Sequence, residues 1–466
     1  MNFAKTVLCA AALVALGLAL GACSPPQDRT NYYAYLEQDT AVKGRTGVLL
    51  TALGQPEEYE FSFYNKYLNH IFEAAFPPLL KLIVMRDRGT VLLDPANPTA
   101  VEQFTPSELM DCFGSTVNEQ GIPYTQLPVQ WVKPRTSDSH AYGHFLLKGK
   151  NGFVDIAERS SVKIAASYYG RMPGNIIPFK QQHRALFSDI ESLLAEQFPG
   201  TPMKTAWSMY PDTIAQAIEE LLSEKVETIV VCNLFPVYSN LEEFNSLFVE
   251  IGQMVAGRAK IVFSPFAGVY ESYRAPFVAM ARAEIEQLPA ASKKLLVLTR
   301  HGFPEMKGEP WHDLAPVFYD NLLREVEQAL SGSNTQVVIA DTEFACSEHD
   351  PKNLRLSAAE ALAQGLDQGS DAVVFVLVDF MSENTDTIFC AREEALETIG
   401  FTYAGTVPYS DFSVPFRTDM RYGATRIILS GAPVGDMYRP MLARGIFDAL
   451  STVLRAEAWP ALTVGS

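Results

Sequence analysis

A histidine follows a short apolar run and begins a polar loop in the stretch LLVLTRHGFPEMKGEPW, residues 295–311. The run predicts a buried strand, so the imidazole of His301 lies at the end of that strand. The loop after it is interrupted by Pro304, Gly308 and Pro310. A neutral imidazole has a reference pKa of about 6.5, so it accepts protons near neutral pH and also ligates metal ions. Because a single histidine often has a structural role, His301 indicates a site only if partners accompany it.

Acidic side chains gather in a second stretch, FMSENTDTIFCAREEALETIG, residues 380–400. We expect a helix with Ser382 as its N-cap and Asp386 in its first turn, where the helix dipole favours an ionised carboxylate. The pattern fits a solvated acidic surface, and it equally fits a track that conducts cations or protons. The residues that recur at helical spacing, and are expected to share one face, are Asp386, Cys390, Glu393, Glu394 and Glu397.

The sequence motifs of several reaction classes are missing. The chain contains no GxxxxGK[ST] loop, no GxGxxG after the first strand, no GxSxG and no HExxH. Nucleotide hydrolysis, hydride transfer and serine-hydrolase chemistry therefore lack their usual sequence support.

The composition indicates a globular protein with an acidic balance. The chain has 466 residues, of which 48% are hydrophobic and 20% charged, and its formal net charge is −17. This length suits two domains. Because no basic surplus exists to neutralise phosphates, we expect no nucleic-acid partner, whereas a cationic partner is compatible with the charge.

The N-terminus resembles a bacterial lipoprotein signal. Lys5 precedes the apolar run VLCAAALVALGLALGA, which is shorter than the roughly 20 residues of a membrane-spanning helix. The run ends in Leu20-Gly21-Ala22-Cys23, where the small residues suit a signal peptidase and the thiol suits lipid attachment. We expect lipidation at Cys23 and a protein that is exported and lipid-anchored to a bacterial membrane, on the periplasmic side or at the cell surface.

Apolar runs alternate with helical patterns along the rest of the chain, which predicts βα units and parallel sheets. The strands are continuously apolar, so both faces of each sheet should be covered by helices. We expect an α/β fold of two doubly wound, Rossmann-like lobes with parallel sheets and a cleft between the lobes. The expected division is a signal peptide at 1–23, a tether at 24–44, an N-terminal lobe at 45–275 and a C-terminal lobe at 276–466. Residues 85–150 fit no regular pattern.

Ligands of open parallel sheets lie beyond the carboxyl ends of the strands. His301 lies at such an end. Aromatic and sulfur-containing side chains lie near the other strand ends, where they fit either plain packing or the apolar walls of a ligand site. These wall residues are Met209, Tyr210, Phe235, Tyr238 and Trp311.

Four segments, in order, resemble the ferrochelatase family, the type II chelatases that insert a divalent metal into a tetrapyrrole. GVLLTALGQPE is similar to the family's first strand and its leucine-glycine-x-proline turn. AIEELLSEKVETIVVCNLFPVYSN is similar to a helix, strand and Y-P-x-Y-S turn. LTRHGFPEMKGEPW is similar to the loop that holds the active-site histidine. VFVLVDFMSENTDTIFCAREEALE is similar to the F-x-S-D-H-x-E-T-L segment.

The resemblance implies a chelatase-like fold and a lyase of haem biosynthesis. It implies that His301 is a catalytic proton acceptor and metal ligand, that Asp386 is its catalytic and metal-binding carboxylate, and that Glu394 also binds metal. The substrates would be a porphyrin or related tetrapyrrole and a divalent metal, Fe²⁺ or Co²⁺, with no organic cofactor. The substrate-binding residues would be Met209, Tyr210, Phe235, Tyr238, Arg300 and Trp311.

Four positions depart from the family pattern. Asp386 replaces a glutamate, Asn384 stands where many members have histidine, Cys390 replaces an acidic residue, and Arg300 replaces a small residue before His301. A cation at Arg300 repels a metal and suits a propionate or phosphate. These departures, together with the export signal, favour a second hypothesis: a lipoprotein that binds or delivers haem, a tetrapyrrole or a metal complex without catalysis.

Overall fold

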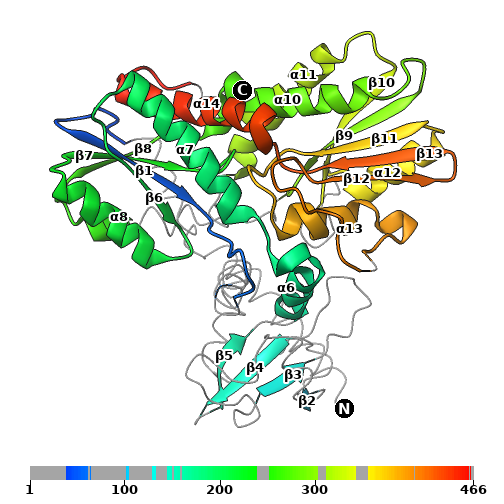
Figure 1. Cartoon of the computed structure of the whole chain (residues 1–466), viewed down its shortest axis with the longest axis horizontal. Helices are drawn as coiled ribbons and strands as arrows, with labels where there is room; N and C mark the ends of the chain where they lie inside the picture. The colour runs from blue at the N-terminus through cyan, green and yellow to red at the C-terminus, as the bar shows by residue number, and fades with distance from the viewer. Residues whose placement is uncertain are drawn as a thin grey trace, which may run out of the picture. The chain divides into compact units, whose positions relative to one another are not determined.

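The computed structural model describes residues 38–60, 63, 101–103, 129–132, 144–149, 152–157, 160–238, 251–302, 311–342, 355–403, 405–460 and 462. The chain forms two compact units. One includes residues 59–170, and the other includes residues 30–58, 171–305 and 309–466. The larger unit contains both parallel sheets and the residues discussed below (Figure 1).

The first sheet of the larger unit is fully parallel, with the strand order β6-β1-β7-β8. Its central strands have no exposed side chains, which is typical of a sheet covered on both faces. Helix α8 (Pro211–Ser223) starts with a proline, which is tolerated where no intrahelical hydrogen bond is lost. It packs against β6. The strands are β1 (Thr46–Ala52), β6 (Met203–Trp207), β7 (Thr228–Asn233) and β8 (Lys260–Phe263).

The second sheet has the order β10-β9-β11-β13-β12, and only its edge strand β12 is antiparallel. The central pairs β9–β11 and β11–β13 are parallel, so the carboxyl ends of these strands meet at one edge. The strands are β9 (Lys294–Arg300), β10 (Thr335–Asp341), β11 (Ala372–Leu377), β12 (Arg417–Tyr422) and β13 (Thr425–Ser430).

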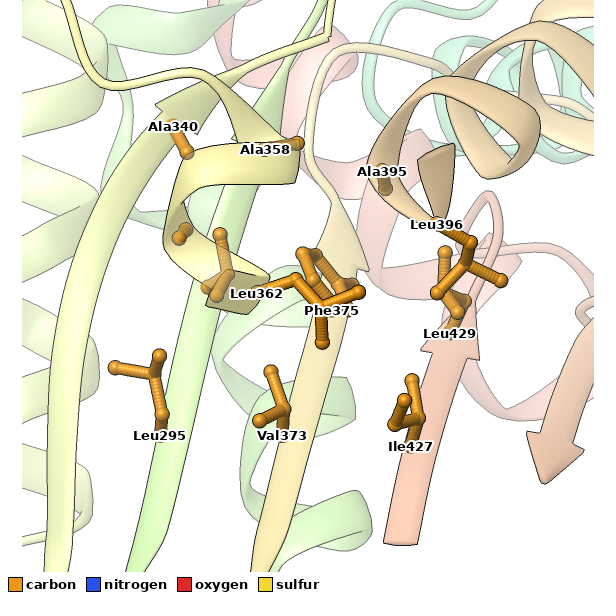
Figure 2. Close-up of a cluster of buried hydrophobic side chains, with 12 residues drawn as sticks. Leu295, Ala340, Ala358, Leu362, Val373, Phe375, Ala395, Leu396, Ile427 and Leu429 are labelled. Atoms are coloured by element: carbon orange, nitrogen blue, oxygen red, sulfur yellow. The ribbon is translucent and has the colours of Figure 1, made fainter. Parts of the chain in front are cut away.

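One face of the second sheet forms an apolar cluster under helix α12 (Ala358–Asp367) (Figure 2). Leu295 and Val297 of β9 belong to this cluster. Because side chains alternate along a strand, Leu296 and Leu298 point to the opposite face, and they too are fully buried. Helices therefore cover both faces of the sheet.

Three long helices pack together in the larger unit: α7 (Phe179–Gln197), α10 (Glu271–Glu286) and α14 (Gly435–Leu454). The C-terminal helix α14 lies along both α7 and α10 (Figure 1). It also contacts β7 of the first sheet. The last helix of the chain thus links the two sheets within one core. Helix α11 (Trp311–Ala329) packs against α10 and β10.

The smaller unit contains an antiparallel sheet with the order β2-β3-β4-β5, followed by helix α6 (Ser160–Arg171). Its strands are β2 (Val101–Gln103), β3 (Val129–Val132), β4 (His144–Gly149) and β5 (Gly152–Ala157). Much of this sheet falls in residues 85–150, to which the sequence analysis assigned no element. The predicted α/β fold with two parallel sheets is confirmed. The lobe boundary near residue 275 stays a prediction.

Candidate functional site

His301 follows the last residue of β9 and is held there by the neighbouring strand β11. Its backbone N–H donates to Asp379 Oδ2, and the Tyr319 hydroxyl of α11 donates to the other oxygen of the same carboxylate. The imidazole is partly exposed and lies edge-on to Phe380, with ring centroids 6.0 Å apart. Asp379 therefore fixes the backbone from which the imidazole projects.

The surroundings of the ring indicate its tautomer. His301 Nδ1 lies 2.9 Å from the carbonyl oxygen of Gly302. Because a carbonyl oxygen only accepts hydrogen bonds, Nδ1 carries the proton in the neutral ring. The basic lone pair is then on Nε2, which is the form that accepts a proton or ligates a metal.

Asp379 was not predicted to belong to the site, although the carboxyl ends of the parallel strands were the expected ligand-binding edge. Burial raises the pKa of the Asp379 carboxyl to about 6, against the lowering effect of hydrogen bonds from Tyr319 and His301. The signal available in the sequence was an acidic residue close behind a fully apolar strand, with only Val378 between them. The end of this strand and the end of β9 meet at one edge of the sheet.

Arg300, the last residue of β9, turns towards β10. Its guanidinium pairs with Asp341, which has no exposed side-chain surface, and lies over the rings of Trp311 at 5.5 Å and Tyr319 at 5.4 Å. Arg355 approaches the same carboxylate at 3.8 Å. Arg300, His301 and Trp311, which were predicted separately, therefore form one cluster around the end of β9.

Asp386 begins a π-helical turn, Asp386–Cys390, that continues into the short helix α13 (Ala391–Ala395) and a 3₁₀ turn, Glu397–Ile399. The regular helix expected here is therefore wrong, and its acidic residues do not lie on one continuous α-helical face. Asp386 and Glu394 are both partly exposed. A π turn inside a helix is often found at functional sites, because the extra residue re-aims the side chains around it.

The predicted cap at Ser382 is also wrong. The side-chain oxygen of Asn384 accepts from the Thr387 backbone N–H at 2.8 Å, while the buried Ser382 hydroxyl has no hydrogen-bond partner among the described residues. Asn384, identified in the sequence as a departure from the family pattern, thus fixes the start of the turn.

Glu383 anchors the same turn from within the core. Its carboxylate accepts from the backbone N–H groups of Phe416 at 2.8 Å and Ala432 at 2.9 Å, and from the Thr387 hydroxyl at 2.5 Å. Arg392, fully buried, donates to the Thr387 carbonyl at 2.6 Å and contributes an attractive charge to Glu383. Glu383 is therefore fully buried and held at both carboxylate oxygens, whereas Asp386 of the same segment is partly exposed.

Two glutamines from the chain around the first sheet reach this segment. Gln55, in the turn after β1, donates to the Thr385 hydroxyl at 3.2 Å and accepts from the Thr385 N–H at 3.3 Å. Gln182 of α7 accepts from the Glu383 N–H at 2.8 Å. The residues that precede Asp386 are thereby tied to both sheets.

The other four predicted wall residues follow strands β6 and β7 of the first sheet. Tyr210 is partly exposed and has the Lys180 ammonium 4.2 Å above its ring, and Phe235 is partly exposed after β7. Met209 and Tyr238 are buried, and the Tyr238 hydroxyl donates to the Ser264 carbonyl at 3.3 Å. Their role as walls of one site with His301 stays a prediction.

His301 and Asp386 follow neighbouring strands of the same sheet, β9 and β11. Within the described residues, no three His, Cys, Asp or Glu side chains converge as a metal-binding group. A groove of about 560 Å³ lies between α10 and α11, and none of the predicted site residues lines it. The metal ligands and the cleft between lobes stay predictions.

Two parallel sheets of βα units, with a histidine and an aspartate after neighbouring strands, define an α/β protein of the chelatase type. The chain belongs to the ferrochelatase family. The family model described as Ferrochelatase matches residues 153–407, which is more than half of the 466 residues and includes His301 and Asp386.

Individual relatives match shorter stretches. The ferrochelatase of Enterobacter sp. (strain 638) is 32% identical over 143 residues, which cover 30% of this chain and 43% of that protein. The ferrochelatase of Escherichia coli (strain SMS-3-5 / SECEC) is 26% identical over 150 residues, which cover 32% of this chain and 46% of that protein. The chain thus spans less than half the length of these curated relatives.

Among solved structures, SirB from Bacillus subtilis with Fe³⁺ is 13% identical with a TM-score of 0.38, covering 59% of this chain and 90% of that one. The predicted lipidation site, Cys23, and the signal sequence lie outside the described residues. In the part of the chain that the structure describes, no helix has the length and apolar character needed to cross a membrane.

Proposed function

We propose that this protein inserts a divalent metal ion, Fe²⁺ or Co²⁺, into a porphyrin or a related tetrapyrrole. The observation that carries the proposal is the placement of His301 and Asp386 within the family match, after neighbouring strands of one sheet, with the basic lone pair of His301 on Nε2. Imidazole and carboxylate together suit first-row divalent metals.

The chemistry requires two protons to leave. Metallation replaces two pyrrole N–H protons with one M²⁺ ion, while the ion sheds water. In the proposed mechanism, His301 Nε2 accepts a proton from the macrocycle, and the ionised Asp386 attracts the hydrated cation and passes protons to solvent. Glu394 extends this acidic route, and no organic cofactor is needed.

The charges around His301 do not oppose a cationic substrate. Arg300 is a departure from the family pattern that in isolation repels a metal. Here it is paired with Asp341, which Arg355 also approaches, and it lies near enough to Asp379 to interact with the charge of that carboxylate. Because the charges of this cluster balance, the barrier expected from Arg300 is largely offset.

The proposed tetrapyrrole-binding residues fall into two groups, one with partly exposed side chains and one with buried side chains. Tyr210, Phe235 and Arg300 have surface available for a ligand. Met209, Tyr238 and Trp311 are 7%, 1% and 2% exposed, so they act as the layer beneath. We retain the first three as direct contacts and assign the buried three to support of the site.

Anaerobic metal insertion tests the proposal. The purified full chain is mixed with porphyrin and Fe²⁺ or Co²⁺, and the shift of the porphyrin absorbance is followed. Wild type should turn over, and His301→Ala should lose about 100-fold in kcat, as expected for removal of a general base. Asp386→Asn tests the proposed carboxylate in the same assay. Asp320→Asn, at an exposed position on α11, is its matched control.

A stoichiometric absorbance change without turnover would instead support the non-catalytic carrier. That outcome separates binding or delivery of a tetrapyrrole from its metallation.

We further propose that the protein is an exported lipoprotein attached to a bacterial membrane through Cys23, on the basis of the signal-like N-terminus.

A further inference from the structure

We propose that Gln55 and Gln182 form an interlobe clasp, defined as these two carboxamides and the residues 383–385 they hold, that positions Asp386 for reaction. Both glutamines are positioning residues that act through the backbone directly before Asp386. The inference rests on the proposed function, because Asp386 is the carboxylate of the proposed site.

The first half of the clasp begins at β1. The strand ends at Ala52, and Gly54 takes a positive φ of 92°. A Cβ at Gly54 would lie 2.5 Å from Trp207 Cβ, so only glycine allows this close approach. The turn delivers Gln55, which is 3% exposed, to Thr385. Its carboxamide forms two hydrogen bonds with Thr385: the oxygen accepts from the backbone N–H, and the nitrogen donates to the hydroxyl.

The second half comes from α7. Gln182 is 7% exposed and uses both ends of its carboxamide. Its oxygen accepts from the Glu383 N–H at 2.8 Å, and its nitrogen donates to the Tyr409 hydroxyl at 3.0 Å and the Phe412 carbonyl at 2.9 Å. The carboxamide therefore joins the start of the Asp386 segment to the chain that precedes β12.

These bonds meet a need created by the turn itself. The first N–H groups of a helical segment have no intrahelical acceptor. The N–H of Thr385, at the start of the segment, and that of Glu383, two residues before it, are buried and are each satisfied by a carboxamide oxygen. Loss of either acceptor leaves a buried donor without its bond, which favours movement of the segment. Because misplacement of a reacting group by roughly 1 Å can cost about 100-fold in rate, a small movement of Asp386 is enough to matter.

The clasp differs from an ordinary packing contact in its coupling to Asp386. If the glutamines only hold the fold together, their loss should lower stability. It should also reduce kcat by the same factor in the wild type and in the Asp386→Asn variant. If they act through Asp386, their loss should have no further effect once the carboxylate is removed.

The test uses Gln55→Met and Gln182→Met, which keep side-chain length and remove the hydrogen bonds, in the full chain. We expect each to lower kcat for metal insertion about tenfold with little change in the KM for porphyrin, consistent with a displaced reacting group. In the Asp386→Asn background the same substitutions should add no more than about twofold. Gln216→Met, at an exposed position of α8, is the control. Equal losses in both backgrounds would overturn the proposal.

A second measurement does not depend on activity. Amide hydrogen exchange across residues 383–390 should accelerate at least tenfold in Gln55→Met and Gln182→Met while peptides from β1 and β11 keep their protection. Unchanged exchange in this segment would overturn the clasp even if the enzyme is active. If wild type inserts no metal but the exchange accelerates as expected, the clasp stands as a positioning device and the proposed function fails alone.

Discussion

The backbone N–H of His301 donates to the carboxylate of Asp379, so a side chain at the end of β11 fixes the proposed base at the end of β9. The strands are parallel neighbours, with Leu377 opposite Thr299. The same carboxylate accepts from the Tyr319 hydroxyl of α11. One buried acid thus connects two strands and a helix at the position of the proposed chemistry.

Asp379→Ala should reduce both stability and metal insertion. It removes the acceptor of two buried donors, and each unsatisfied donor costs about 1–3 kcal/mol. We expect kcat to fall about tenfold, because His301 is less firmly placed. Asp379→Asn keeps an acceptor oxygen and should lose less. Urea unfolding and anaerobic kinetics measure the two effects, and an Asp379→Ala protein with wild-type kcat would contradict this role.

Arg300→Met should destabilise the protein, because it leaves the fully buried Asp341 without its closest cation. Removing one partner of a buried pair costs about 3–5 kcal/mol, and Arg355 at 3.8 Å should reduce that cost. Adding Asp341→Asn should restore much of the stability. If Arg300 also binds a propionate, the double variant should regain stability but keep a KM for porphyrin above the wild-type value. A KM equal to that of the wild type in the double variant would show that the role of Arg300 is structural alone.

Acid should destabilise the fold through His183. The imidazole is buried against Phe179 and Trp207, and burial lowers its pKa to about 4. Because the unfolded chain titrates near 6.5, it binds more protons than the folded chain between these values, and stability falls as the pH drops from 6.5 towards 4.

His183→Leu should remove this part of the pH dependence. Between pH 7.5 and pH 5, the wild type should lose about 2 kcal/mol more than the variant in urea unfolding. Parallel losses in both proteins would show that His183 does not titrate in this range.

The sequence was sufficient for the parallel sheets because the relevant signals are local. The runs around Leu295 and Val373 are continuously apolar, and the helix at Ile214 has regular spacing, so both could be assigned from the pattern alone. The placement of His301 after a strand followed from the same reasoning.

The partners of the site were not predictable in this way. Asp379, Gln55 and Gln182 gain their roles from contacts 78 to 330 residues away in the chain, which no periodicity reports. The π turn at Asp386 was missed because its residues fit α-helical spacing, whereas the residue that holds its start, Glu383, does so through tertiary contacts.

Gly431→Ala should disturb the Asp386 turn without touching it. A Cβ at Gly431 would lie 2.1 Å from Glu383 Oε1, and that oxygen already accepts from two backbone N–H groups. Glu383 cannot retreat without breaking them, so we expect a loss of about 1–3 kcal/mol in stability, as for overpacking of a core. Gly252→Ala, where the added Cβ meets nothing within 4 Å, is the matched control and should be nearly neutral. Because Glu383 is one of the clasped residues, faster amide exchange across 383–390 should accompany the loss. Equal unfolding free energies in the two alanine variants would show that the Glu383 contacts tolerate the extra methyl group.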